Sequence, residues 1–231
     1  EEAAGWFARA VEMDPNRETA YRYWGDALKA DGRMEEALPK FIEAVVAEPY
    51  NRTAWYGLIN WAKAKEVELA HPAIKSPNSI GEKEDGTINI VIDAGSLGKK
   101  DGTGSWMIYS LSRAAWRGEQ FKKEYPEEKE YRHSLREEVE ALSLVANTVT
   151  ELVEGGKIET LDPSIATLLK LKEEGLLESY VLISRADEGI LQDYEAYRAE
   201  DGNREKLKRY IEQYILHSEE EPASPEEVQE K

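Results

Sequence analysis

The N-terminal quarter of the sequence repeats a pattern of small and apolar residues with a period of 34 positions. The recurring pairs are Ala3 and Ala37, Phe7 and Phe41, Ala10 and Ala44, and Pro15 and Pro49. Self-similarity at such a period is typical of stacked units that bury their apolar faces only against one another. Proline ends each unit, because it cannot donate the next backbone hydrogen bond of a helix. The repeat therefore favours an array of paired helices.

Aromatic and small residues between these positions refine the prediction. They are Tyr21, Trp24, Gly25, Leu28 and Ala37, and Trp55 follows Tyr21 by one period. This pattern resembles the tetratricopeptide repeat (TPR) family, whose unit is a pair of antiparallel helices. The resemblance covers about residues 3–64 and implies a helix over 3–13, a full repeat over 18–48 and a further helix over 52–65. Gly25 and Ala37 would let two helices approach closely, while larger residues such as Phe41 fill the space around them.

The array is short, because the pattern breaks after residue 65. His71 and Lys75 stand where a further helix would need alanine and a large apolar residue, and Pro72 interrupts the stretch. Three repeats are normally needed to bury a continuous core. We therefore expect the array to continue upstream of residue 1 or to cap itself against the rest of the chain.

The family resemblance implies a concave groove, lined by the first helix of each pair, that binds extended peptides. Transferred to this sequence, the groove would present Thr19, Arg22, Asp26, Lys29, Thr53, Tyr56, Asn60 and Lys63. Its arginine and lysines would suit a partner with acidic side chains or a C-terminal carboxylate. Only Asn60 matches the carboxylate clamp of the chaperone-binding members, so that ligand is not supported. The alternative is that these are ordinary solvated residues of a helix face.

Charge and composition exclude several classes of partner. The chain has 231 residues and a net charge of −17, which opposes binding to nucleic acid or anionic lipid. It contains no cysteine, which removes disulfides and thiolate chemistry. No apolar run is long enough to predict insertion into a membrane, and no secretory signal is visible. Cytoplasmic localisation is slightly favoured, while a periplasmic or secreted protein that has lost a signal segment fits as well.

Residues 76–86 mark the start of a second part of the chain. This stretch, SPNSIGEKEDG, has the composition of a surface linker between residues 1–75 and a domain over 87–217. Alternating isoleucines predict a strand over 87–92, and helices are expected over 103–117, 127–154, 162–174, 187–200 and 203–216. Gly155–Gly156 is expected to end the second of these helices, and Asp162 to cap the third, with Pro163 at its first position and Gly175 at its end. Residues 179–184 fit either a helical turn or a second strand. The acidic tail, 218–231, is expected to be disordered. The predicted fold is mainly α, a TPR-type helical array followed by a helical domain with one short β element.

A glycine-rich segment, INIVIDAGSLGKKDGTGSWMIYS, suggests a strand, a loop and a helix that could bind phosphate. It fits neither the Walker pattern, because Asp93 replaces the first glycine, nor the dinucleotide pattern, because Met107 replaces the third. A simpler anion site remains open at Lys99, Lys100, Thr103, Gly104 and Ser105, at the start of the helix. The alternative is an ordinary connection with glycines at its turns.

Catalytic motifs are weak elsewhere. Glu130 and His133 match the Glu-x-x-His motif of di-iron bundles, but helical geometry would place them and Glu137 on an exposed face opposite the apolar stripe. Three histidines and no cysteine leave little for a metal site or a nucleophile, so we expect no cofactor and no enzymatic activity. The sequence favours a non-catalytic protein-interaction or scaffold module. Two alternatives stay open: residues 87–217 form a ligand-binding or enzymatic domain recruited by the repeats, or the domain caps a longer upstream solenoid.

Overall fold

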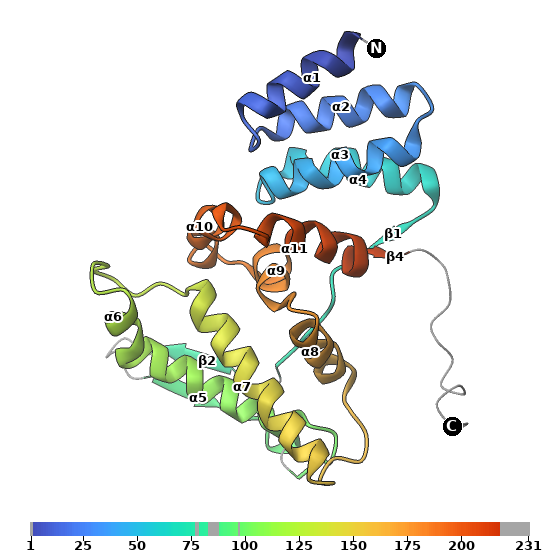
Figure 1. The fold of residues 1–231 in the computed structure, drawn as a ribbon. Coiled ribbons are helices and arrows are strands. Elements are labelled where there is room, and N and C mark those ends of the chain that lie inside the picture. The colour runs from blue at the N-terminus through green and yellow to red at the C-terminus, as the bar shows by residue number, and fades with distance from the viewer. Residues whose placement is uncertain (1, 77–78, 83–87, 97, 218–231) are drawn as a thin grey trace. The chain divides into compact units, whose positions relative to one another are not determined.

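The computed structural model describes residues 2–76, 79–82, 88–96 and 98–217. The fold is mainly α-helical with a small β component, as predicted. The chain divides into two compact units (Figure 1). The N-terminal unit comprises Glu1–His71 together with Leu207–Lys231, and the C-terminal unit comprises Pro72–Lys206.

The N-terminal unit begins with two antiparallel helix pairs. Its helices are α1 (Glu2–Met13), α2 (Glu18–Ala30), α3 (Met34–Ala47) and α4 (Arg52–Lys65). Asn51 caps α4, since its side chain accepts a hydrogen bond from Thr53 N at 3.0 Å. Glu66, with a φ of 56°, ends the helix in the left-handed region. These bounds agree with the helix expected over 3–13, the pair of helices expected over 18–48 and the helix expected over 52–65.

Phe41 is the centre of this helical packing. Its side chain is fully buried, as predicted, and Tyr21 and Leu28 are buried as well. Gly25 in α2 and Gly57 in α4 both face its ring: a Cβ atom would lie 2.5 Å from Phe41 Cε1 at position 25 and 2.2 Å from Phe41 Cδ1 at position 57. Only glycine leaves room for the ring at these two positions. The predicted role of Gly25 in a close approach between helices is confirmed, and Gly57 shares it.

Beyond α4 the helical pattern stops, as predicted, and the chain extends. Strand β1 (Glu68–Leu69) pairs antiparallel with β4 (Leu216–His217), and Leu69 lies opposite Leu216. Ala70 N also donates a 3.1 Å hydrogen bond to Ile215 O. The strand β4 follows the end of α11 (Asn203–Tyr210) and a π-helical turn, Ile211–Ile215. The last described residues of the chain therefore complete the N-terminal unit.

The C-terminal unit combines a hairpin with a helical core. Strands β2 (Ser79–Glu82) and β3 (Ile88–Val91) are antiparallel, with Ile80 opposite Ile90. The helices are α5 (Trp106–Ala115), α6 (Phe121–Glu124), α7 (Leu135–Glu154), α8 (Pro163–Glu173), α9 (Leu177–Tyr180) and α10 (Tyr194–Ala199). Shorter 3-10 and π-helical turns connect several of them, including Trp116–Gln120 and Val181–Arg185.

Helix α7 forms the centre of this unit, in contact with α5 and α8. Its buried apolar residues are Ala141, Leu142, Val145, Ala146 and Val149, and α8 contributes Ile165, Leu168 and Leu171. Asp162 caps α8 through hydrogen bonds from Ser164 N and Ile165 N, with Pro163 at its first position, as predicted. Gly156 and Gly175 follow α7 and α8 with positive φ angles, which fits the predicted ends of these helices.

Two expectations for the second part of the chain differ from the structure, and one alternative that the sequence left open, a helical turn or a strand over 179–184, is decided. The interval 76–86 contains strand β2, so the expected strand has a hairpin partner, while residues 77–78 and 83–87 lie outside the described residues. Residues 179–184 are helical and do not form a strand. The long helix begins at Leu135 and not near 127, because Ser134 caps it: Glu137 N donates to Ser134 Oγ at 3.2 Å.

The apolar stripe expected along this helix is also only partly correct. Leu142, Ala146 and Val149 are buried, whereas Val153 is 44% exposed. The helix expected over 103–117 is similarly one-sided, because Trp106 and Trp116 are buried while Leu111 is 52% exposed. Each helix has one face in the core and one in solvent.

The unit boundaries differ from the expected domains in two respects. The change of unit falls between His71 and Pro72, and residues from Leu207 onward belong with the N-terminal helices. The tail 218–231, predicted to be disordered, lies outside the described residues. Within the described part of the chain, no helix has the length and apolarity that crossing a membrane requires.

Candidate functional site

The predicted groove residues of the N-terminal unit lie on two neighbouring helices. Arg22, Asp26 and Lys29 lie on α2, while Tyr56, Asn60 and Lys63 lie on α4. Two contacts join the helices along this surface, which we call the α2–α4 surface. Thr53 Oγ1 donates to Glu18 Oε1 at 3.2 Å, and Lys29 Nζ donates to Asn60 O at 3.5 Å.

Glu18 is a residue of this surface that sequence reasoning missed. The residue is only 4% exposed, and its carboxylate also accepts hydrogen bonds from Thr19 Oγ1 at 3.1 Å and Arg22 Nε at 3.2 Å. The charge of Arg22 is thus partly balanced within the surface, and its guanidinium stacks over the Tyr23 ring at 4.5 Å. The sequence predicted a basic surface at Arg22. Because Glu18 pairs with this arginine, less of its positive charge is available to a peptide than the sequence suggested.

An apolar pocket of about 610 Å³ adjoins the α4 side of this surface. It is lined by Arg52, Trp55, Tyr56, Ile59, Ala62, Lys63, Val67, Leu69, His71 and Ile215. Tyr56 and Ile59 are each 46% exposed, so apolar surface is open to a ligand. Burial lowers the pKa of His71, which keeps its imidazole neutral at pH 7.

Two members of the predicted groove, Tyr56 and Lys63, are part of this pocket. The other lining residues were not predicted, because the pocket depends on the pairing of β1 with β4, which brings Ile215 beside α4. No pattern in the sequence indicates that pairing. Arg52 and Lys63 place two positive charges at an otherwise mainly apolar pocket.

The predicted anion loop is largely occupied by contacts within the chain. Thr103 N donates to Asp101 Oδ1 at 2.9 Å, and Ser105 N donates to Gly102 O at 3.0 Å. Lys100 forms an ion pair with Glu159. Lys99, Gly104 and Ser105 line a shallow pocket of about 290 Å³ with mainly apolar neighbours. Two of the backbone donors on which the anion interpretation depended are therefore already used.

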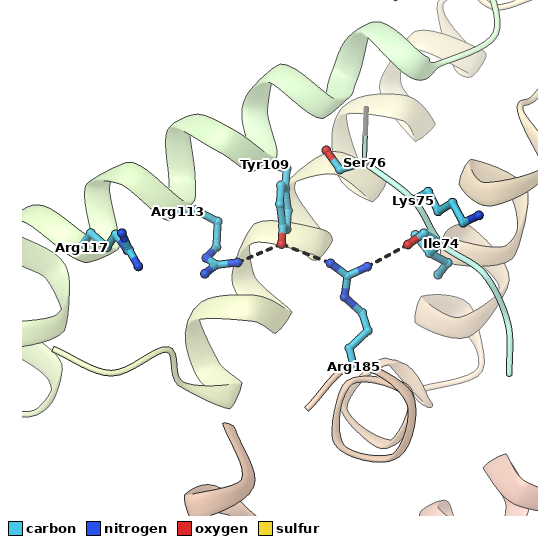
Figure 2. Close-up of a pocket in the computed structure, with 7 residues that line it drawn as sticks. All are labelled: Ile74, Lys75, Ser76, Tyr109, Arg113, Arg117 and Arg185. Carbon is cyan, nitrogen blue, oxygen red and sulfur yellow. Dashed lines mark hydrogen bonds between the residues drawn. The ribbon is translucent and has the colours of Figure 1, made fainter. Parts of the chain in front are cut away.

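A different pocket of the C-terminal unit gathers cationic side chains. It has a volume of about 460 Å³ and is lined by Ile74, Lys75, Ser76, Tyr109, Arg113, Arg117 and Arg185. We call it the arginine pocket. Tyr109, Arg113 and Arg117 follow one another at intervals of four residues, so they project from one face of α5 and the turn after it. Figure 2 shows Arg113 and Arg185 directed at the Tyr109 hydroxyl from two sides.

Two buried carboxylates of α7 hold this cluster in place. Arg113 Nε donates to Glu137 Oε1 at 2.6 Å, and Arg113 Nη1 donates to Glu138 Oε2 at 3.0 Å. Arg185 Nε lies 2.8 Å from Glu138 Oε1. Tyr109 Oη donates to Glu138 and accepts from Arg113 Nη1 at 2.9 Å. The arginine side chains are therefore oriented before any ligand arrives.

The position of Glu137 corrects a prediction. The sequence placed it on an exposed face with Glu130 and His133, but Glu137 is fully buried, while Glu130 is exposed. The helical-wheel argument failed because residues 125–134 are not helical, so Glu130 and His133 do not continue the face of α7. His133 instead lies between two carboxylates, 3.1 Å from Glu138 Oε2 and 2.7 Å from Asp187 Oδ2.

The electrostatics of this cluster keep its charges fixed around pH 7. Burial opposes ionisation of Glu138, but the hydrogen bond with His133 and the charges of Arg185 and Arg113 outweigh it and lower its pKa to about 2. Burial, together with the negative charge of Glu138, raises the pKa of Tyr109 to about 12. Burial lowers the pKa of Arg113 and of Arg185, yet their acidic and phenolic neighbours raise it further, above its usual range.

Comparison with known proteins does not assign a family or a function to these sites. No protein-family model, no curated protein and no solved structure matches the chain.

Proposed function

We propose that the N-terminal unit is a TPR-type, non-catalytic module that binds an extended peptide on the α2–α4 surface. One observation carries the proposal: the α2–α4 surface is continuous with the 610 Å³ apolar pocket, because Tyr56 and Lys63 belong to both. A peptide running along α4 would contact both.

The composition of the pocket supports a specific kind of peptide. Trp55, Tyr56 and Ile59 offer apolar and aromatic surface for one large apolar side chain. Arg52 and Lys63 would attract a carboxylate next to that side chain. We therefore propose a peptide segment that carries a large apolar residue beside an acidic residue or the C-terminal carboxylate.

The exposed polar side chains of α2 and α4 would bind the peptide backbone. Asn60 is exposed on α4, and an amide side chain can both donate to a backbone carbonyl and accept from a backbone N–H. Lys29 lies beside it, within 3.5 Å of the Asn60 carbonyl. These contacts are independent of peptide sequence, so the pocket would supply the specificity.

A peptide-display selection with the intact chain tests the proposal. The library presents random short peptides with either a free or an amidated C-terminus. We expect enrichment of an apolar residue next to an acidic residue or a free carboxylate. Replacing Arg52 and Lys63 together by Glu should weaken binding of an enriched peptide at least about tenfold, because the pocket would then repel the carboxylate.

Lys65→Glu is the matched control, since Lys65 lies on the same helix outside the pocket and pairs with Glu35 at 2.8 Å. It should leave binding nearly unchanged. A selection that enriches no motif, or an enriched peptide whose affinity is the same in the Arg52/Lys63 variant and the wild type, would refute the proposal and favour ordinary solvated helix faces.

A further inference from the structure

We propose that the acidic segment 218–231 is an intramolecular ligand of the apolar pocket beside α4, where it competes with an external peptide. This proposal rests on the peptide-binding function proposed above and adds a regulator to the same site. The segment, SEEEPASPEEVQEK, lies outside the described residues, so its sequence and its point of attachment carry the proposal.

The segment is attached to the chain beside the pocket. Ile215 lines the pocket, and the described residues end two positions later, at His217 in strand β4. Strand β1 pairs with β4 and contributes Leu69 to the same pocket. Segment 218–231 therefore begins next to the site that it is proposed to bind.

The length of the segment is sufficient to reach every part of α4. This helix has 14 residues and is about 21 Å long, at a rise of about 1.5 Å per residue. Val228 follows His217 by 11 positions, and an extended chain of that length spans up to about 38 Å. Arg52 at the start of α4 and Lys63 near its end are therefore both within range.

The charge of the segment is complementary to the charge of the pocket. Residues 218–231 include six glutamates and one lysine, which gives a net charge of −5. The described residues that line the pocket include two cations, Arg52 and Lys63, and no acidic residue. Neither cation forms an ion pair or a side-chain hydrogen bond with another described residue. Their charges are therefore open to the carboxylates of the segment.

The segment also contains the kind of motif proposed for the external peptide. Val228 directly follows Glu226 and Glu227, so an apolar side chain stands beside two carboxylates. In the proposed complex the valine enters the apolar pocket and the glutamates pair with its two cations. Valine buries less apolar surface in the 610 Å³ pocket than a larger side chain would, so a peptide with a larger apolar residue displaces the segment.

Weak binding is sufficient, because the segment is covalently attached to the protein. A short tether gives an effective concentration of about a millimolar or more. A dissociation constant of about 1 mM for the free segment would then leave about half of the pockets occupied. An external peptide binds only the remaining fraction, so the segment raises the apparent dissociation constant of that peptide.

Carbodiimide cross-linking of the full chain tests the contact directly. The reagent activates a carboxylate, and attack by the Lys63 amine then forms an amide bond, which mass spectrometry of the digested protein locates. We expect Lys63 to link to a glutamate of 218–231. Lys65 is the internal control, since it lies on the same helix outside the pocket and should link to Glu35, 2.8 Å away.

The cross-link also shows which chain supplies the segment. Isotope-labelled and unlabelled chains are mixed before the reagent is added. A link within one chain supports an intramolecular ligand. A link formed only between labelled and unlabelled chains would assign the pocket to the segment of a second copy, and the absence of any link at Lys63 would leave it unoccupied; both results contradict the proposal.

A competition measurement tests the regulatory effect. In the tail-neutral variant all six glutamates of 218–231 are replaced by Gln in the full chain. A peptide enriched in the selection should bind this variant at least about twofold more tightly than the wild type, because half-occupied pockets become free. Fluorescence anisotropy of the labelled peptide measures both affinities.

The matched control makes the same change of net charge, from −17 to −11, in the C-terminal unit. It replaces six exposed glutamates by Gln: Glu127, Glu130, Glu151, Glu154, Glu173 and Glu188. Peptide affinity should stay near the wild-type value in this control. An equal gain in both variants would show that net charge and not segment 218–231 sets the affinity, which would refute the proposal.

This proposal and the proposed function fail in different ways. An enriched peptide that binds the wild type and the tail-neutral variant equally well, with no cross-link at Lys63, overturns the intramolecular ligand and leaves the peptide-binding function intact. A cross-link at Lys63 together with a selection that enriches no motif in either chain has the opposite meaning. The pocket would then bind its own segment and no external peptide.

Discussion

Glu138 is the residue on which the charge network of the C-terminal unit depends. Its fully buried carboxylate accepts from Tyr109 at 2.8 Å and pairs with Arg113 at 3.0 Å and Arg185 at 2.8 Å. His133 adds a further contact at 3.1 Å. Removing one partner of a buried charge pair leaves an uncompensated charge in a medium of low polarity. The two arginines would then lose the group that orients them.

Replacing Glu138 by Gln should lower the free energy of unfolding by about 3 kcal/mol at pH 7, since it removes the buried partner of two arginines. Urea denaturation followed by circular dichroism measures this change. A Glu140→Gln variant is the control, because Glu140 lies on the exposed face of the same helix. Equal stabilities of the two variants would contradict the role assigned to Glu138.

The same residue predicts a pH dependence. Its pKa is about 2 in the folded state and about 4.5 in the unfolded chain, so the folded state favours the ionised form. The stability that this provides is complete above pH 4.5 and is lost as the pH falls through about 2. The stability difference between wild type and Glu138→Gln should therefore shrink by about 3 kcal/mol over this range. A constant difference, measured by urea denaturation across the range, would contradict it.

At the scale of elements, the packing of α2, α3 and α4 depends on two glycines around one phenylalanine. Gly25 and Gly57 approach the Phe41 ring so closely that a methyl group at either position would overlap it. Phe41 is fully buried. The sequence indicated Gly25 through its place in the repeat, whereas Gly57 stood out only once the ring was located.

Gly57→Ala should destabilise the chain by about 1–3 kcal/mol, because the added methyl group overpacks the core. Gly5→Ala is the matched control: Gly5 lies in α1, and its methyl group would meet no atom within 4 Å among the described residues outside the neighbouring backbone of its own helix, so alanine should stabilise the helix by up to about 1 kcal/mol. Urea denaturation of both variants provides the comparison. If Gly57→Ala is as stable as the wild type, Gly57 does not pack closely against the Phe41 ring.

Helix α7 shows where element prediction from sequence reaches its limit. Its end at Gly155–Gly156 and the cap of α8 at Asp162 were predicted correctly, because both depend on neighbouring residues. Its start was predicted some eight residues too early. Residues before Ser134 are held by distant contacts, such as the pair between Arg132 and Asp193 at 2.7 Å, and such contacts leave no local pattern.

For the whole molecule, the main finding is that the N-terminal unit is completed by the far end of the chain. Lys208 Nζ donates to Glu43 Oε1 of α3 at 3.1 Å, and β4 pairs with β1. Tyr210, Ile211 and Ile215 are buried in this segment. A fragment that ended at the expected domain boundary, residue 75, would lack all of these contacts.

A chain that ends at Lys206 should therefore show weakened protection of α4 and β1, compared with a chain that ends at His217. Hydrogen exchange read by mass spectrometry measures this protection. We expect amides of α4 to exchange at least about tenfold faster in the shorter chain, because the neighbouring apolar residues and the β1–β4 pairing are missing. Unchanged exchange in α4 would show that residues 207–217 are not part of the N-terminal unit.

The sequence by itself determined the mainly helical fold, the helices of the N-terminal repeat, the helix caps and the glycines that end helices. These features depend on residues within about one or two helical turns, where side-chain type and spacing decide the backbone conformation. The candidate peptide surface was indicated only through the family resemblance, whose groove positions fall on these residues. Its pocket was not, because Ile215 joins it only through the β1–β4 pairing.

Only the tertiary structure decided the arginine pocket, the burial of Glu137 and Glu138 and the composition of the N-terminal unit. Arg113 and Glu137 are separated by 24 positions, and Arg185 and Tyr109 by 76. In a chain with 47 acidic and 30 basic residues, the sequence offers many equivalent ion pairs. The fold selects among them, because only burial makes a particular pair strong enough to orient its side chains.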